Sequence, residues 1–154
     1  SGGLVGSEMC IRDRVIDAGV SPDDLVTFKY EEQGVATLED GIYALEANLS
    51  DPAFKDKMVK FVRASMKGWK YAEANPDEAA GIVLDNDATG AQTEKHQKRM
   101  MGEIAKLTAG SNGTLDPADF DRTVSTLLAG GSDPVITKTP KGAWTHEITD
   151  LALK

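Results

Sequence analysis

The 154-residue sequence has little of the residue types on which metal and redox sites depend. Its single cysteine, Cys10, excludes an internal disulfide and a cysteine-based metal cluster. Only two histidines are present, His96 and His146, and neither has a second histidine or cysteine at the spacing of zinc ligands. We therefore expect no metal and no cofactor.

Positive charge and long apolar runs are also scarce. The 17 Lys and Arg residues are outnumbered by 25 Asp and Glu residues, which gives a net charge of −8. A negative field repels nucleic acid phosphates and anionic lipid surfaces, so we expect no nucleic acid partner. No run approaches the roughly 20 apolar residues of a spanning helix, so we expect no direct membrane insertion. An apolar content of 40% suits a single core at this length.

The first 14 residues differ in pattern from the rest of the chain. They show neither a sustained helical period nor a strand alternation, and residues 6–14, GSEMCIRDR, resemble a translated sequencing-adapter scar. We interpret residues 1–14 as a non-native, adapter-derived segment, and the alternative is a disordered terminal arm. In the first case the natural chain begins near Val15, and any upstream part, including a signal peptide, has been lost.

Residues 15–45 predict extended structure. Residues 15–19 are typical of the last turn of a helix that ends at a glycine. Residues 25–30 alternate apolar and polar side chains and are rich in β-formers, which predicts a half-buried strand. Residues 41–45 are its expected partner strand. The loop between them, residues 31–40, carries four carboxylates and one glycine.

From residue 50 onward the pattern is helical. Ser50 is a suitable cap, and apolar side chains then recur every three or four residues, which predicts a stripe that packs in a core. The stripe consists of Phe54, Met58, Phe61, Val62, Ser65, Trp69 and Ala72. Further helix starts are predicted at Asn75-Pro76, at Thr89 with Gln92 and at Asp116-Pro117, and residues 148–153 suggest a last short helix.

Three motifs follow one another along the chain: EDGIY at 39–43, RASMKGW at 63–69 and NPDEA at 75–79. Together they resemble the substrate-binding proteins of ABC importers, in the branch for sulfonates, taurine and thiamine-pyrimidine precursors. The resemblance implies an α/β fold: the C-terminal portion of a two-lobed periplasmic-binding-protein fold of type II, mostly helical here with a few strands. Residues 15–45 would be the end of one lobe and the interlobe crossing strands, and residues 46–154 the C-terminal helical part.

The same resemblance implies a function. The chain would be the solute-binding component of an ABC importer, and it would capture a small molecule between two lobes. That solute would be a thiamine pyrimidine precursor, a related amine or heterocycle, or a sulfonate. The partners implied are the solute and the importer permease, the location is periplasmic or extracytoplasmic, and the full-length protein is expected to be a monomer.

The candidate ligand-binding residues lie in the predicted crossing: Glu31, Glu39, Asp40 and Tyr43. Carboxylates accept hydrogen bonds from an amine, and a tyrosine ring offers a face for stacking. Residues 30–45 contain no Arg or Lys, which disfavours a sulfonate ligand. The alternative for each carboxylate is that it is simply solvated, as most Asp and Glu are.

Two other functions are weighed against solute binding. The resemblance extends to a cytosolic enzyme that makes the thiamine pyrimidine, but its cysteine-rich segment is not seen here. No nucleophile elbow, P-loop or zinc-binding histidine pair is present either, so we expect no catalytic residues and no enzyme. A helical interaction module would explain the amphipathic helices, but it leaves residues 25–45 unexplained.

Overall fold

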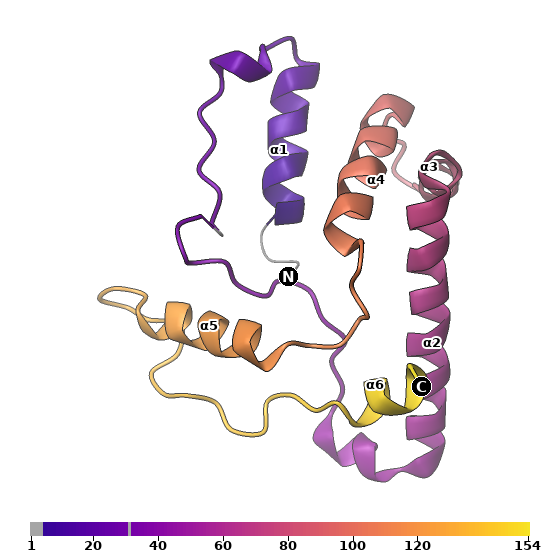
Figure 1. Cartoon of the computed structure of the whole chain (residues 1–154), viewed down its shortest axis with the longest axis vertical. Coiled ribbons are helices and arrows are strands. Elements are labelled where there is room, and N and C mark those ends of the chain that lie inside the picture. The colour runs from indigo at the N-terminus through magenta and orange to yellow at the C-terminus, as the bar shows by residue number, and fades with distance from the viewer. Residues whose placement is uncertain (1–4, 31) are drawn as a thin grey trace.

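The computed structural model describes residues 5–30 and 32–154 (Figure 1). Within these residues the regular elements are all helices. They are α1 (Val5–Asp17), the 3₁₀ turns η1 (Pro22–Asp24) and η2 (Glu46–Ser50), α2 (Pro52–Ala74), α3 (Pro76–Asp85), α4 (Glu94–Thr108), α5 (Pro117–Leu128) and α6 (Glu147–Ala152).

The α/β fold class is therefore wrong for the described residues, since none of them forms a strand. Residues 25–30 and 41–45 have no regular secondary structure and do not pair with each other. The chain turns between them through backbone hydrogen bonds within the turn, such as Val35 N to Tyr30 O at 3.1 Å. A strand needs a neighbour for its backbone groups, whereas a helix supplies its own partners. The β-forming side chains alone did not create that neighbour.

The longest helix, α2, starts near the predicted position, but the predicted cap Ser50 is wrong by one residue. Asp51 is the cap, and its side chain accepts a hydrogen bond from Ala53 N at 2.9 Å. Pro52 occupies the first turn, where its missing N–H has no partner to lose. The predicted start at Asn75-Pro76 is also confirmed, because α3 follows α2 with Asn75 between them.

The predicted cap of α4 at Thr89 is wrong. Thr93 is the cap, and its hydroxyl accepts from His96 N at 3.3 Å. Thr89 is instead used in the α3–α4 connection, where its backbone N–H and its hydroxyl both donate to Asp87 Oδ1. The start of α5 is confirmed, since Asp116 caps it by accepting from Ala118 N at 2.8 Å.

The helices form an open arrangement rather than a dense bundle. α4 packs on α3, α2 and α1, and α6 packs on the lower part of α2 (Figure 1). Arg63 fixes α6 by donating to the carbonyl oxygens of Leu151 and Ala152, each at 3.2 Å. Within the described residues, the buried apolar side chains are few: Val62, Ala79, Ala80, Val124 and Ala152.

The terminal helix α1 crosses the boundary that the sequence suggests at residues 14 and 15. It ends at Asp17, and Gly19 follows with φ +101°, so the predicted glycine stop is confirmed. The origin of residues 1–14 and the division into segments 15–45 and 46–154 stay predictions.

Candidate functional site

The predicted ligand-binding cluster lies on the extended stretch between η1 and η2. Glu39 is partly exposed and Asp40 is exposed. Neither carboxylate forms a hydrogen bond or an ion pair within the described residues, so both keep their acceptor capacity for a ligand. Glu31 lies outside the described residues.

Tyr43 belongs to the same stretch and is 84% exposed. Its ring lies over Gly41: a Cβ built on that glycine would be 3.4 Å from the ring carbon Cζ and from the hydroxyl oxygen. The absence of a side chain at position 41 lets the ring fold back beside the backbone that follows Asp40. An open aromatic face and a free carboxylate therefore occur within a few residues.

The chain around this cluster is tied to α5. Leu38 N donates to Thr123 Oγ1 at 2.9 Å, and Arg122 Nε donates to Ala36 O at 2.9 Å. Arg122 is itself oriented by an ion pair with Asp119 at 2.7 Å. These contacts hold residues 36–38, which immediately precede Glu39, in a defined place.

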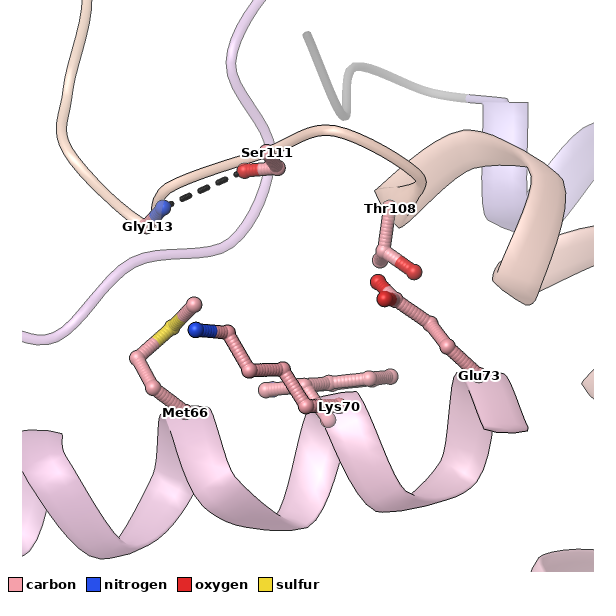
Figure 2. A pocket seen from close by; sticks show the side chains of 7 residues that line it. Met66, Lys70, Glu73, Thr108, Ser111 and Gly113 are labelled. Atoms are coloured by element: carbon pink, nitrogen blue, oxygen red, sulfur yellow. Dashed lines mark hydrogen bonds between the residues drawn. The ribbon is translucent and has the colours of Figure 1, made fainter. Parts of the chain in front are cut away.

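A separate pocket lies between the C-terminal half of α2 and the α4–α5 connection (Figure 2). Its volume is about 140 Å³. The residues that line it are Met66, Trp69, Lys70, Glu73, Thr108, Ser111 and Gly113. None of the predicted ligand-binding residues is among them, and Trp69 is a residue that the sequence predicts to pack in the core.

The core assignment of Trp69 is wrong, since its side chain is 46% exposed. The neighbouring wall of the pocket requires a glycine. Gly113 has φ +75°, and a Cβ there would lie 2.5 Å from the Met66 sulfur. Ser111 Oγ accepts from Gly113 N at 3.2 Å and fixes the turn (Figure 2).

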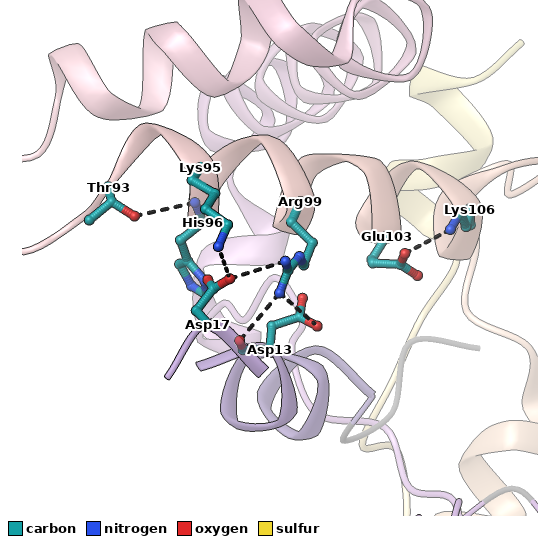
Figure 3. Close-up of polar contacts among 8 residues, drawn as sticks. All are labelled: Asp13, Asp17, Thr93, Lys95, His96, Arg99, Glu103 and Lys106. Atoms are coloured by element: carbon teal, nitrogen blue, oxygen red, sulfur yellow. Dashed lines mark hydrogen bonds and ion pairs between the residues drawn. The ribbon is translucent and has the colours of Figure 1, made fainter. Parts of the chain in front are cut away.

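A second polar cluster joins α1 to α4 (Figure 3). The Asp17 carboxylate lies between Lys95 Nζ at 2.9 Å and Arg99 Nη2 at 3.0 Å. The hydrogen bond from Lys95 lowers the pKa of Asp17 below its ordinary value; partial desolvation opposes this, and the charge of Arg99 adds to it. Asp13 is buried, and Arg99 reaches both its carboxylate, at 3.8 Å, and its backbone oxygen, at 3.3 Å.

His96 is part of the same region and is only 6% exposed, although its polar neighbours in sequence place it on a solvated face. The cluster is a brace between two helices rather than a ligand site. Among the described side chains, no group of three or more His, Cys, Asp or Glu residues is arranged to hold a metal ion. None of the described helices is both long enough and apolar enough to cross a membrane.

Comparison with known proteins gives one finding. Residues 10–79, less than half of the chain, match the family described as NMT1/THI5 like. The matched range contains Glu39, Asp40 and Tyr43, and it ends within the first turn of α3. No curated protein and no solved structure matches the chain. At the coarse level of this one match, the N-terminal half of the chain is similar to the NMT1/THI5-like family, in agreement with the resemblance to substrate-binding proteins.

Proposed function

We propose that the chain serves as a solute-binding component of an ABC importer. The observation that carries the proposal is the match of residues 10–79 to the NMT1/THI5-like family, which is mostly made up of substrate-binding proteins. The partners proposed are a small-molecule solute and the importer permease. The proposed location is extracytoplasmic, and the proposed state of the full-length protein is a monomer.

We infer that the solute carries an amine or a nitrogen heterocycle, as a thiamine pyrimidine precursor does. Glu39 and Asp40 supply two neighbouring acceptors that no described residue satisfies, and Tyr43 supplies an exposed ring. Hydrogen bonds from an amine to a carboxylate are about twice as strong as those between neutral groups. The same stretch contains no Arg or Lys with which to bind a sulfonate.

The ties to α5 support this choice of residues. A binding side chain on an otherwise unpaired stretch needs a fixed backbone, because ordering it on binding opposes affinity. The hydrogen bonds of Ala36 and Leu38 to α5 supply part of that order directly before Glu39. We therefore expect Glu39 to contribute to affinity.

A binding role is proposed in preference to a catalytic one, although the THI5 members of the family are enzymes. His146 Nε2 is 2.8 Å from Leu115 O, and His96 belongs to the α1–α4 brace. Both rings are thus engaged in contacts within the fold. Incubation with a bound pyrimidine followed by mass spectrometry tests this point: unchanged solute supports binding alone, and a new product contradicts it.

Calorimetric titration with a thiamine pyrimidine precursor, taurine, an alkyl sulfonate and a polyamine tests the ligand class. For the ligand that binds, Glu39→Gln should weaken affinity by about tenfold or more, the range for loss of a charge-assisted hydrogen bond. Glu46→Gln, an exposed carboxylate in η2, is the matched control and should bind as the parent does. Equal affinities for the two variants would remove Glu39 from the site, and a panel with no binder would contradict the solute proposal.

A further inference from the structure

We propose that the pocket between α2 and the α4–α5 connection binds a small amino-acid zwitterion, with its carboxylate at Lys70 and its ammonium group at Glu73 and Trp69. This site is separate from the cluster at residues 39–43 and does not depend on the function proposed for that cluster. Its residues come from α2, from the last residue of α4 and from the connection after α4 (Figure 2).

The first support is that the charged groups of Lys70 and Glu73 are unpaired within the described residues. Lys70 and Glu73 are three residues apart on α2, a spacing at which opposite charges commonly pair. The chain makes such pairs elsewhere: Glu103 with Lys106 at 2.7 Å, and Asp119 with Arg122 at 2.7 Å. Lys70 and Glu73 form no ion pair with each other or with any other described residue. An ammonium group and a carboxylate thus remain available at one pocket.

The second support is the direction in which the side chains of Lys70 and Glu73 point. In Figure 2 the side chain of Lys70 is directed toward Met66 and that of Glu73 toward Thr108, so the charged groups lie on opposite sides of the pocket. The Thr108 hydroxyl is already used in the α4 backbone, where it donates to Ile104 O at 3.1 Å. A ligand that satisfies both charges must therefore carry a negative group at one end and a positive group at the other.

The third support is the size and the wall of the pocket. The pocket has a volume of about 140 Å³ and is partly open to solvent, so it has room for a small ligand of roughly six to eight non-hydrogen atoms. Trp69 and Met66 provide an apolar wall for a short carbon chain. An ammonium group near the indole face also gains a cation–π interaction, for which tryptophan is the best partner. β-Alanine and γ-aminobutyrate meet all three requirements.

Tryptophan fluorescence reports on this pocket directly. The chain has two tryptophans, so a Trp144→Phe variant leaves Trp69 as the sole emitter. We expect saturable changes of Trp69 emission on titration with β-alanine and γ-aminobutyrate. Propionate and propylamine, each with one of the two charges, should bind at least tenfold more weakly. A Trp69→Phe variant, in which Trp144 reports, should show no change. Because Trp144 packs against Phe120, calorimetry on the parent chain provides the same affinities without this substitution.

Charge removal completes the test. Lys70→Gln and Glu73→Gln should each raise the dissociation constant of the better zwitterion at least tenfold. Lys67→Gln and Glu46→Gln remove the same charges outside the pocket and should leave the constant unchanged. Absence of saturable binding by either zwitterion, or equal loss in the pocket and control variants, overturns the proposal. Glu39→Gln should have no effect here, so failure of this site and failure of the proposed solute site give different results.

Discussion

Two regions of the molecule differ in how their backbone hydrogen bonds are formed: the helices α2, α3 and α4, and the extended residues 25–45. In the helices each turn supplies the hydrogen bonds of the next, so neighbours are needed only to bury side chains. Within its described residues the extended stretch has no ladder partner, and two hydrogen bonds tie it to α5. The helices are stabilised by packing, and the stretch by a few polar contacts.

The same contrast appears in side-chain burial. Ala80 on α3 is fully buried, with 0% exposure, where α3 packs on α4. By comparison, Val26, Phe28 and Leu45 on the extended stretch are 82%, 71% and 72% exposed. An alternating apolar pattern therefore shows which side chains favour burial, but only a neighbouring element achieves it. We expect substitutions in the two regions to have different effects.

The largest effect is expected for Ala80→Asp. A carboxylate at this fully buried position has no partner, so we expect a loss of at least about 3 kcal/mol in the free energy of unfolding. Urea unfolding followed by circular dichroism measures this loss, and the amide exchange of residues 25–45 should not change. Ala53→Asp, exposed in the first turn of α2, is the control and should be neutral or slightly stabilising. A loss below about 1 kcal/mol would mean that the α3–α4 contact contributes little.

A smaller and more local effect is expected for Thr123→Val, which removes the acceptor of Leu38 N. One lost hydrogen bond costs about 1 kcal/mol, so protection of the Leu38 amide from exchange should fall about fivefold. Helix content should stay the same, because the hydroxyl bond from Thr123 to Asp119 O is a local addition to α5. Ser125→Ala removes a similar hydroxyl bond, to Asp121 O, without touching the extended stretch. If both variants lower the exchange protection of the Leu38 amide equally, the effect does not come from the hydrogen bond between Leu38 and Thr123.

The two regions also differ in how well the sequence predicts them. The starts of α2, α3 and α5 follow from Pro52, Pro76 and Pro117, because a first-turn proline acts locally, and the side chains of Asp51 and Asp116 add a cap to α2 and α5. The strands at residues 25–30 and 41–45 were wrong because a strand depends on a partner that local sequence does not specify.

Among candidate site residues, local reasoning proposed Glu39, Asp40 and Tyr43, which stay predictions, and it did not indicate the pocket. Lys70 and Glu73 are ordinary surface residues of a helix in the sequence, and only the α4–α5 connection gives them a common cavity. The glycine at position 113 was the one available signal in the sequence, since glycine after Ser111-Asn112 indicates a turn, and its φ is positive in the structure. Nothing in the sequence places that turn against Met66.

The attachment of α1 to α4 is intermediate between the packed helices and the extended stretch, because it combines helix packing with ion pairs. Asp17 has a lowered pKa, so its ionised form stabilises the contact above the pKa of the unfolded chain, about 4. That contribution is lost as the pH falls from there through the lowered pKa. The protection factors of the α1 amides, which compare the measured exchange rate with the intrinsic rate at the same pH, should therefore fall below about pH 4 in the parent. Asp17→Asn should show lower protection factors already at neutral pH and a flatter pH profile. Asp121→Asn, an exposed change on α5, should keep the parent profile.

The smallest effect is expected within one helix, where no second region is involved. Glu94 and Lys98 pair at 2.7 Å on the exposed side of α4, and their hydrogen bond lowers the pKa of Glu94 and raises that of Lys98. Because salt screens such pairs, Lys98→Gln should leave the thermal midpoint nearly unchanged at physiological ionic strength. Glu94→Gln should cost slightly more, since Glu94 also faces the positive end of the helix dipole. Nuclear magnetic resonance titration of Lys98 should show its pKa return toward the ordinary value in Glu94→Gln. The thermal midpoint of Thr123→Val serves as the comparison. If either variant lowered the midpoint as much as Thr123→Val does, the ordering would be contradicted, because an exposed ion pair would then contribute as much as a hydrogen bond between two parts of the fold.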